Sequence, residues 1–117
     1  MSDSTVQLFG KTERVFIYED GDGEFYVRPA VVVVEGNHIR FRNFTRYAAV
    51  LNPGLFGVAP IGLAPKGAAG DQVTVTLVNG HPGFNPYDVT VLTQGAERSK
   101  EGRLAQGNSR PGAIIDR

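Results

Sequence analysis

The stretch from Gly67 to Gly80 reads Gly67-Ala68-Ala69-Gly70-Asp71-Gln72-Val73-Thr74-Val75-Thr76-Leu77-Val78-Asn79-Gly80. It follows the short apolar run Leu55-Phe56-Gly57-Val58-Ala59. The Gly-Asp pair is typical of a tight turn, because glycine accepts a positive φ at little cost. Valines then alternate with threonines, which is the pattern of a half-buried strand. Strand, turn and alternating strand together indicate a small all-β domain.

On both sides of this stretch, short strands separated by turn residues are predicted along most of the chain. The Asp20-Gly21-Asp22-Gly23 segment is typical of a hairpin turn, and Pro29 ends the strand that follows it. Residues 60–70 and 79–86 are rich in glycine and proline and are expected to be loops. The expected strands are residues 14–19, 24–28, 30–34, 39–43, 47–51, 55–59, 73–78 and 87–92. This pattern predicts a small antiparallel sandwich or barrel of about seven to eight short strands.

In two of these strands the sequence also predicts which side chains are buried. The four valines of residues 31–34 form an unbroken apolar run, which predicts burial on both faces. In the next strand Ile39, Phe41 and Asn43 are expected to face one side. Arg40 and Arg42 are expected to face the other.

The chain divides into one domain with an arm at each end. Residues 1–12 are polar apart from the pair Leu8 and Phe9, and are expected to form an N-terminal arm. Residues 13–93 hold the predicted strands. Residues 94–117 contain few apolar side chains, four glycines and a small apolar end, so they are expected to form a polar C-terminal arm.

Composition narrows the possible functions. The 117 residues suit a single domain, and the formal net charge is zero because 12 Lys and Arg balance 12 Asp and Glu. A nucleic-acid-binding protein usually has a basic excess, so no nucleic-acid partner is expected. The absence of cysteine excludes disulfides, thiolate nucleophiles and thiolate metal sites. The N-terminal residues are polar, so no signal peptide is expected. No apolar run is long enough to span a membrane, so no membrane is expected as a partner.

Three groups of polar residues have a composition that can form a site. His38 and His81 lack companion ligands at useful spacing and are expected to be loop or surface residues. Asp20, Asp22 and Glu24 alternate with glycines as calcium ligands do, but the hairpin turn explains them with fewer assumptions. Serine is scarce in the expected β-domain, so a serine–histidine–acid triad has no obvious nucleophile, and no catalytic residue and no cofactor are predicted.

A third group mixes basic and aromatic residues between positions 40 and 47. Arginines interleaved with aromatic side chains can stack on single-stranded nucleic acid. The alternation instead predicts that the aromatic side chains point inward. The arginines are then expected to form an outer face that contacts either solvent or a partner. The residues concerned are Arg40, Arg42 and Arg46, with Phe41, Phe44 and Tyr47.

Two families resemble parts of the sequence. Residues 25–92, with Val31 to Asn43 and Gly70-Asp71-Gln72-Val73-Thr74-Val75, resemble the cupredoxin family. The copper ligands of that family do not carry over, because Ala48 and Ala49 stand near the first histidine position. Val78 and Asn79 stand near the cysteine position. Only His81 falls where a histidine ligand would lie, which implies a metal-free module.

The second resemblance covers about a quarter of the chain. Phe56-Gly57-Val58-Ala59, then Ala68-Ala69-Gly70-Asp71-Gln72-Val73-Thr74-Val75 with Asn79-Gly80, resemble tailed-phage head decoration (cement) proteins. Such proteins are small β-domains that bridge capsomers through arms and loops. The resemblance implies a virion as the location. Without it, the cytoplasm is expected.

The sequence therefore predicts a structural or assembly protein, not an enzyme. It is expected to bridge copies of itself, or a major structural protein, by exchange of terminal arms. The alternative is a metal-free cupredoxin-like module that binds a protein partner. The expected interface residues are Leu8, Phe9, Arg40, Arg42, Arg98, Arg103, Arg110, Ile114 and Ile115.

Overall fold

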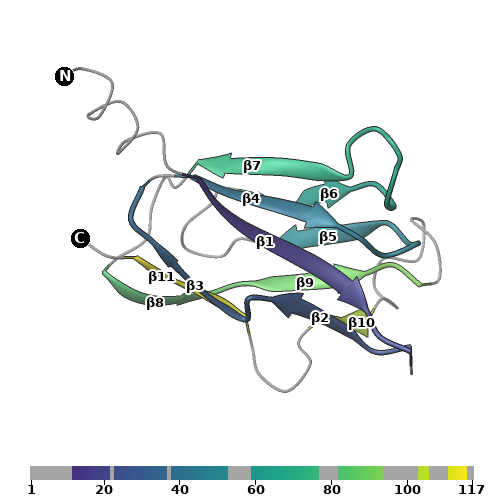
Figure 1. The fold of residues 1–117 in the computed structure, drawn as a ribbon, viewed down its shortest axis with the longest axis horizontal. Coiled ribbons are helices and arrows are strands. Elements are labelled where there is room, and N and C mark those ends of the chain that lie inside the picture. The colour runs from purple at the N-terminus through teal and green to yellow at the C-terminus, as the bar shows by residue number, and fades with distance from the viewer. Residues whose placement is uncertain are drawn as a thin grey trace.

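The computed structural model describes residues 12–21, 23–36, 38–52, 59–76, 82–93, 103–105 and 111–115. These residues form strands joined by turns and contain no helix, which confirms the all-β class. Figure 1 shows the course of the chain. The strands are β1 (Thr12–Glu19), β2 (Phe25–Arg28), β3 (Val31–Val34), β4 (His38–Asn43), β5 (Ala49–Asn52), β6 (Ile61–Leu63), β7 (Gln72–Thr76), β8 (Gly83–Pro86), β9 (Asp88–Val91), β10 (Arg103–Leu104) and β11 (Gly112–Ile115).

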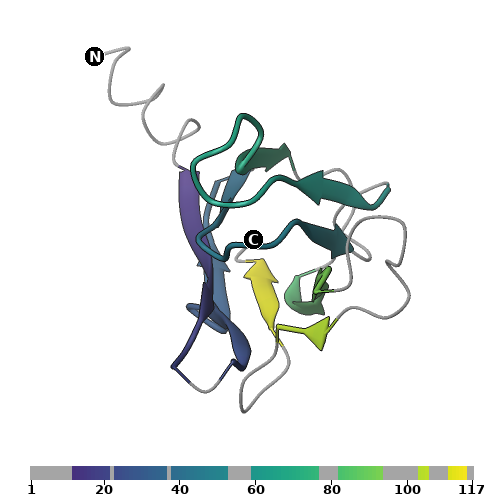
Figure 2. The ribbon, with the colours of Figure 1, turned by 90° about the vertical axis from the view of Figure 1, so that its right-hand side faces the viewer.

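The strands form three sheets, in the orders β2-β1-β4-β7, β10-β9-β5-β6 and β3-β11-β8. In Figure 2, β1, β2 and β4 lie in one layer, and β9 and β11 lie across from them. Each order is open at both ends among the described residues, so the architecture is sandwich-like and no sheet closes into a barrel. The sheets are not wholly antiparallel as expected, because β1 pairs with β4, and β3 with β11, in parallel.

A single apolar core lies between the layers. Phe41, Ile39 and Val15 from the first sheet have no exposed surface, and Leu51 and Val91 meet them from the second. The inward positions follow the strand period of two, so Ile39, Phe41 and Asn43 share the buried face as predicted.

The hairpin between β1 and β2 forms as predicted. The amide of Gly23 donates to the carbonyl of Asp20 over 3.3 Å, and the amide of Glu24 donates to Asp20 Oδ1 over 3.0 Å. Gly23 has a φ of 80°, a conformation that other residues adopt only with strain.

The prediction that residues 31–34 are buried on both faces is wrong. In β3 only Val32 and Val34 face the core, at 4% and 0% exposure. Val31 and Val33 are 43% and 50% exposed, because only the inner face of β3 is covered by another layer among the described residues.

Two segments expected to be loops each contain a strand. β6 pairs with β5, and its Leu63 is 2% exposed, with the prolines placed outside the strand. β8 pairs with β11 despite its glycine and proline. Proline is accepted there because Pro86 lies at the end of the strand, and the amide of the next residue, Tyr87, still donates to the carbonyl of Pro111 over 3.2 Å.

The polar C-terminal arm is also corrected where the structure describes it. β10 pairs with β9, and β11 is inserted between β3 and β8. Ala105, Ala113 and Ile115 are at most 2% exposed. Few apolar residues suffice because small ones fill the remaining space of an existing core. The expected N-terminal arm, apart from Thr12 in β1, lies outside the described residues.

Candidate functional site: two outer sheet faces

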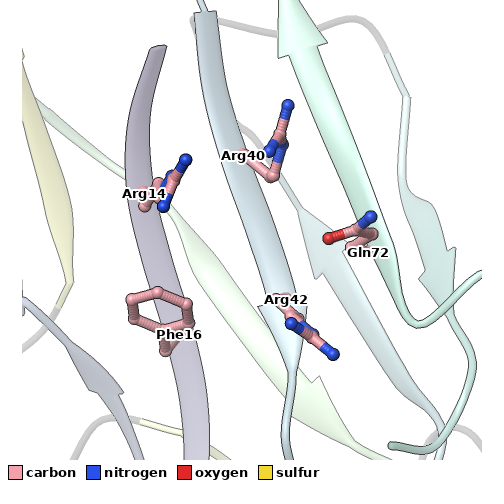
Figure 3. A pocket seen from close by; sticks show the side chains of 5 residues that line it. All are labelled: Arg14, Phe16, Arg40, Arg42 and Gln72. Carbon is pink, nitrogen blue, oxygen red and sulfur yellow. The ribbon is translucent and has the colours of Figure 1, made fainter. Parts of the chain in front are cut away.

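An arginine face covers the outer side of the sheet β2-β1-β4-β7. Alternate residues of β1 and β4 point outward, and the parallel register places Arg14 opposite Arg40 and Phe16 opposite Arg42. The antiparallel register of β4 and β7 places Gln72 opposite Arg42. Figure 3 shows these five side chains rising from three neighbouring strands. They line a pocket of about 230 Å³.

The charge of this pocket is poorly compensated. Arg42 Nε lies 3.9 Å from Asp71 Oδ2, an oxygen that already accepts a 3.0 Å hydrogen bond from the amide of Gly67. Arg40 Nε donates to the Thr74 hydroxyl over 3.4 Å. Within the described part of the chain the Arg14 side chain has no ion pair. Like charges opposite one another on neighbouring strands are destabilising, so the cluster favours an added anion.

An aromatic cluster lies beside the arginines on the same face. It consists of Phe16, Tyr18, Tyr26 and Phe44, all half-buried. The rings of Tyr18 and Phe44 are stacked at 5.5 Å between centroids, and those of Tyr18 and Tyr26 at 5.6 Å. Phe16 lies 5.4 Å from Phe44. Ring contacts of this kind hold the side chains in fixed positions on the sheet.

Cations lie over the rings of this cluster. The guanidinium of Arg42 lies 4.8 Å from the centroid of Phe44, and Lys66 Nζ lies 5.7 Å from it. Arg28 lies 5.8 Å from the ring of Tyr26. Cation–π attraction therefore concentrates positive charge at the rings.

A second, apolar face covers the outer side of the sheet β3-β11-β8. The register aligns Val33, Ile114 and Phe84 in one row across the three strands. Phe84 is 46% exposed, and its ring lies over Gly112, where a Cβ atom would overlap it. Val31 stands beside Gly112 in the next row. Exposed apolar side chains that gather on one face are typical of interaction surfaces.

The predicted interface residues are distributed over three environments. Arg40 and Arg42 lie together on the arginine face, and Ile114 lies half-buried on the apolar face. Ile115 lies in the core at 2% exposure, not on either outer face. Arg103 belongs to β10, and only its backbone is described. The remaining predicted residues lie outside the described ranges: Leu8, Phe9, Arg98 and Arg110.

Sequence reasoning missed several residues of both faces. Arg14 and Phe16 alternate with buried Val15 and Ile17, so the period of two in β1 held the signal for them. The parallel pairing that brings Arg14 beside Arg40 has no local signal in the sequence. Phe84 was missed because glycine and proline around it favoured a loop.

The polar groups weighed for other chemistry have structural roles where they are described. His38 Nδ1 lies 3.3 Å from the hydroxyl of Thr76 on the neighbouring strand. Among the described residues no cluster of His, Asp and Glu could hold a metal ion. Asp22 and His81 lie outside those residues. Buried Asn43 and Thr45 hydrogen bond to one another and to backbone carbonyls.

No helix that is long and apolar enough to cross a membrane occurs in the described part of the chain. No protein-family model and no curated protein matches the sequence.

Proposed function

We propose that this chain is a structural or assembly protein that associates with copies of itself through the apolar face of β3-β11-β8. The observation that carries the proposal is the row formed by Val33, Ile114 and Phe84, which places the exposed side chains of Val33 and Phe84 on either side of half-buried Ile114. The neutral net charge supports it, because copies do not repel one another strongly. A virion shell is the kind of assembly that we propose.

The proposed mode of association is contact between folded domains. In the structure Ala113 and Ile115 of segment 111–115 already pack into the core of their own chain, at 0% and 2% exposure. This position of β11 favours a self-contained binding domain over exchange of the C-terminal arm. A symmetric pair that uses the same face on both copies covers both apolar faces, and such pairs are the proposed building units of the shell.

The test is the molar mass of the full chain by light scattering, over concentrations up to millimolar. We expect association in the wild type and its loss in Val33→Thr and Phe84→Ser. Val50→Thr is the matched control, because Val50 lies at a half-buried outward position of β5 in another sheet. A monomer at every concentration, or equal loss in Val50→Thr, would overturn the proposal.

A further inference from the structure

We infer that the arginine face is a binding site for single-stranded nucleic acid. This site is independent of the apolar face, which belongs to a different sheet. The juxtaposition that supports it is a pocket lined by three arginines beside a cluster of four aromatic rings. Single-strand binding proteins combine the same two elements, a basic groove for the phosphates and aromatic side chains for the bases.

For the binding of phosphates, the local distribution of charged side chains matters more than the net charge of the chain. The chain is neutral overall, yet every Lys and Arg side chain that the structure describes lies on the first sheet or in a loop next to it. Those side chains are Arg14, Arg28, Arg40, Arg42 and Lys66, and also Arg46, which lies outside the pocket and whose charge is neutralised by an ion pair with Glu19. A local basic face on a neutral domain supplies the electrostatic attraction that phosphates require.

The arginines are arranged to follow an extended chain. Arg40 and Arg42 are two residues apart on β4, hence about 7 Å along the strand, and Arg14 lies across from Arg40. The Arg42 side chain is 43% exposed and lines the pocket, so its guanidinium is accessible to an oxygen anion. Guanidinium groups bind phosphate oxygens in paired hydrogen bonds.

The aromatic side chains distinguish a nucleic acid from an acidic protein segment. Carboxylates require cations alone, whereas nucleobases also stack on rings. Phe16 lines the pocket itself and contacts Phe44, whose stack continues through Tyr18 to Tyr26. Gln72, which lines the pocket from β7, carries an amide that can hydrogen bond to base edges or sugars.

The first experiment titrates the full chain into a fluorescently labelled oligothymidylate of about 12 nucleotides at low salt, followed by anisotropy. We expect saturable binding that weakens in Arg40→Gln and Arg42→Gln. Each substitution should reduce the slope of log K against log salt by about 0.7, the value for one lost phosphate contact on a single strand. Arg46→Gln is the matched control, because Arg46 instead binds Glu19 over 3.0 Å.

The second experiment tests the rings. Phe16→Leu should weaken binding roughly 5-fold or more, the range for loss of one base–aromatic stack. Phe84→Leu removes a comparable ring from the apolar face and should leave binding unchanged. Amide NMR spectra of each variant establish that the fold is retained, so that lost binding reports on the face.

Three outcomes would overturn the inference. The first is no binding of the oligonucleotide by a folded wild-type chain. The second is equal competition by polyglutamate of similar charge, which would assign the face to an acidic protein segment. The third is binding that is as strong for a duplex of the same length and insensitive to Phe16→Leu, which would show attraction by charge alone.

Discussion

At the scale of single residues, Asn43 controls the end of β4 where Arg42 and Phe44 turn outward. Its side chain is fully buried, and Nδ2 donates to the carbonyls of Tyr47 and Ala64 over 2.7 and 3.0 Å. Oδ1 accepts from the amide and the hydroxyl of Thr45.

Replacing Asn43 by alanine should therefore lower the free energy of unfolding by about 3 kcal/mol, since several buried groups lose their partners at once. Urea unfolding measures the loss. Asn52→Ala, at the exposed end of β5, is the control and should cost less than about 1 kcal/mol. Equal losses in the two variants would contradict the role assigned to Asn43.

Tyr87 predicts how stability depends on alkaline pH. Its side chain is 1% exposed and contacts the edge of Phe41, and burial raises the pKa of its phenol. The unfolded phenol titrates near pH 10, so above that pH the unfolded state releases a proton that the folded state retains. Stability is thus complete below about pH 10 and declines as the pH rises beyond it.

The measurement is urea unfolding of the wild type and Tyr87→Phe between about pH 8 and pH 11. The alkaline decline should be shallower in Tyr87→Phe, which keeps every other titrating group. Parallel declines in the two proteins would show that Tyr87 does not contribute.

At the scale of elements, two neighbouring residues of β11 face opposite sides of the sheet, one toward the core and one toward the surface. Ile115 points inward at 2% exposure, and Ile114 points outward on the apolar face. Ile115→Ala should lower the free energy of unfolding by roughly 2–5 kcal/mol, as large-to-small core substitutions do.

Ile114→Ala serves as its partner experiment. It should cost less than about 1 kcal/mol of stability and instead weaken self-association in the light-scattering experiment. If the two variants were equally stable, β11 would not be part of the core, and the description of the C-terminal segment as an arm would regain support.

The sequence predicted the strands whose alternation is visible and missed those defined only by their neighbours. β4 and β7 were expected close to their observed bounds because apolar and polar residues alternate in them, and β1 and β2 because β-branched and aromatic residues flank a hairpin turn. β6 and β8 were missed because their glycines and prolines favour loops, although pairing with β5 and β11 overrides that preference. Identical valines in β3 carry no signal for which face is buried.

The candidate sites were predictable only in part for the same reason. Arg40 and Arg42 share a face through local alternation, so the sequence was sufficient to place them together. Arg14 joins them through parallel pairing of strands that are separated by β2 and β3, which no local pattern encodes. The row of Val33, Ile114 and Phe84 likewise depends on three distant segments.

At the scale of the whole molecule, one core cluster includes residues of all three sheets. Sheets that share a core lose stability together, so we expect a single cooperative unfolding transition. The check is urea unfolding followed by far-UV circular dichroism and by tyrosine fluorescence. The two curves should coincide, whereas separate midpoints would show that one sheet unfolds on its own.

The position of β11 also has a consequence for synthesis on the ribosome. Because β11 separates β3 from β8, neither of them has its sheet partner until Ile115 has left the exit tunnel. β3, with its four valines, therefore remains unpaired from its own synthesis until β11 has been made. During that interval the nascent chain is exposed to misfolding, and a chaperone that shields the valines would protect it.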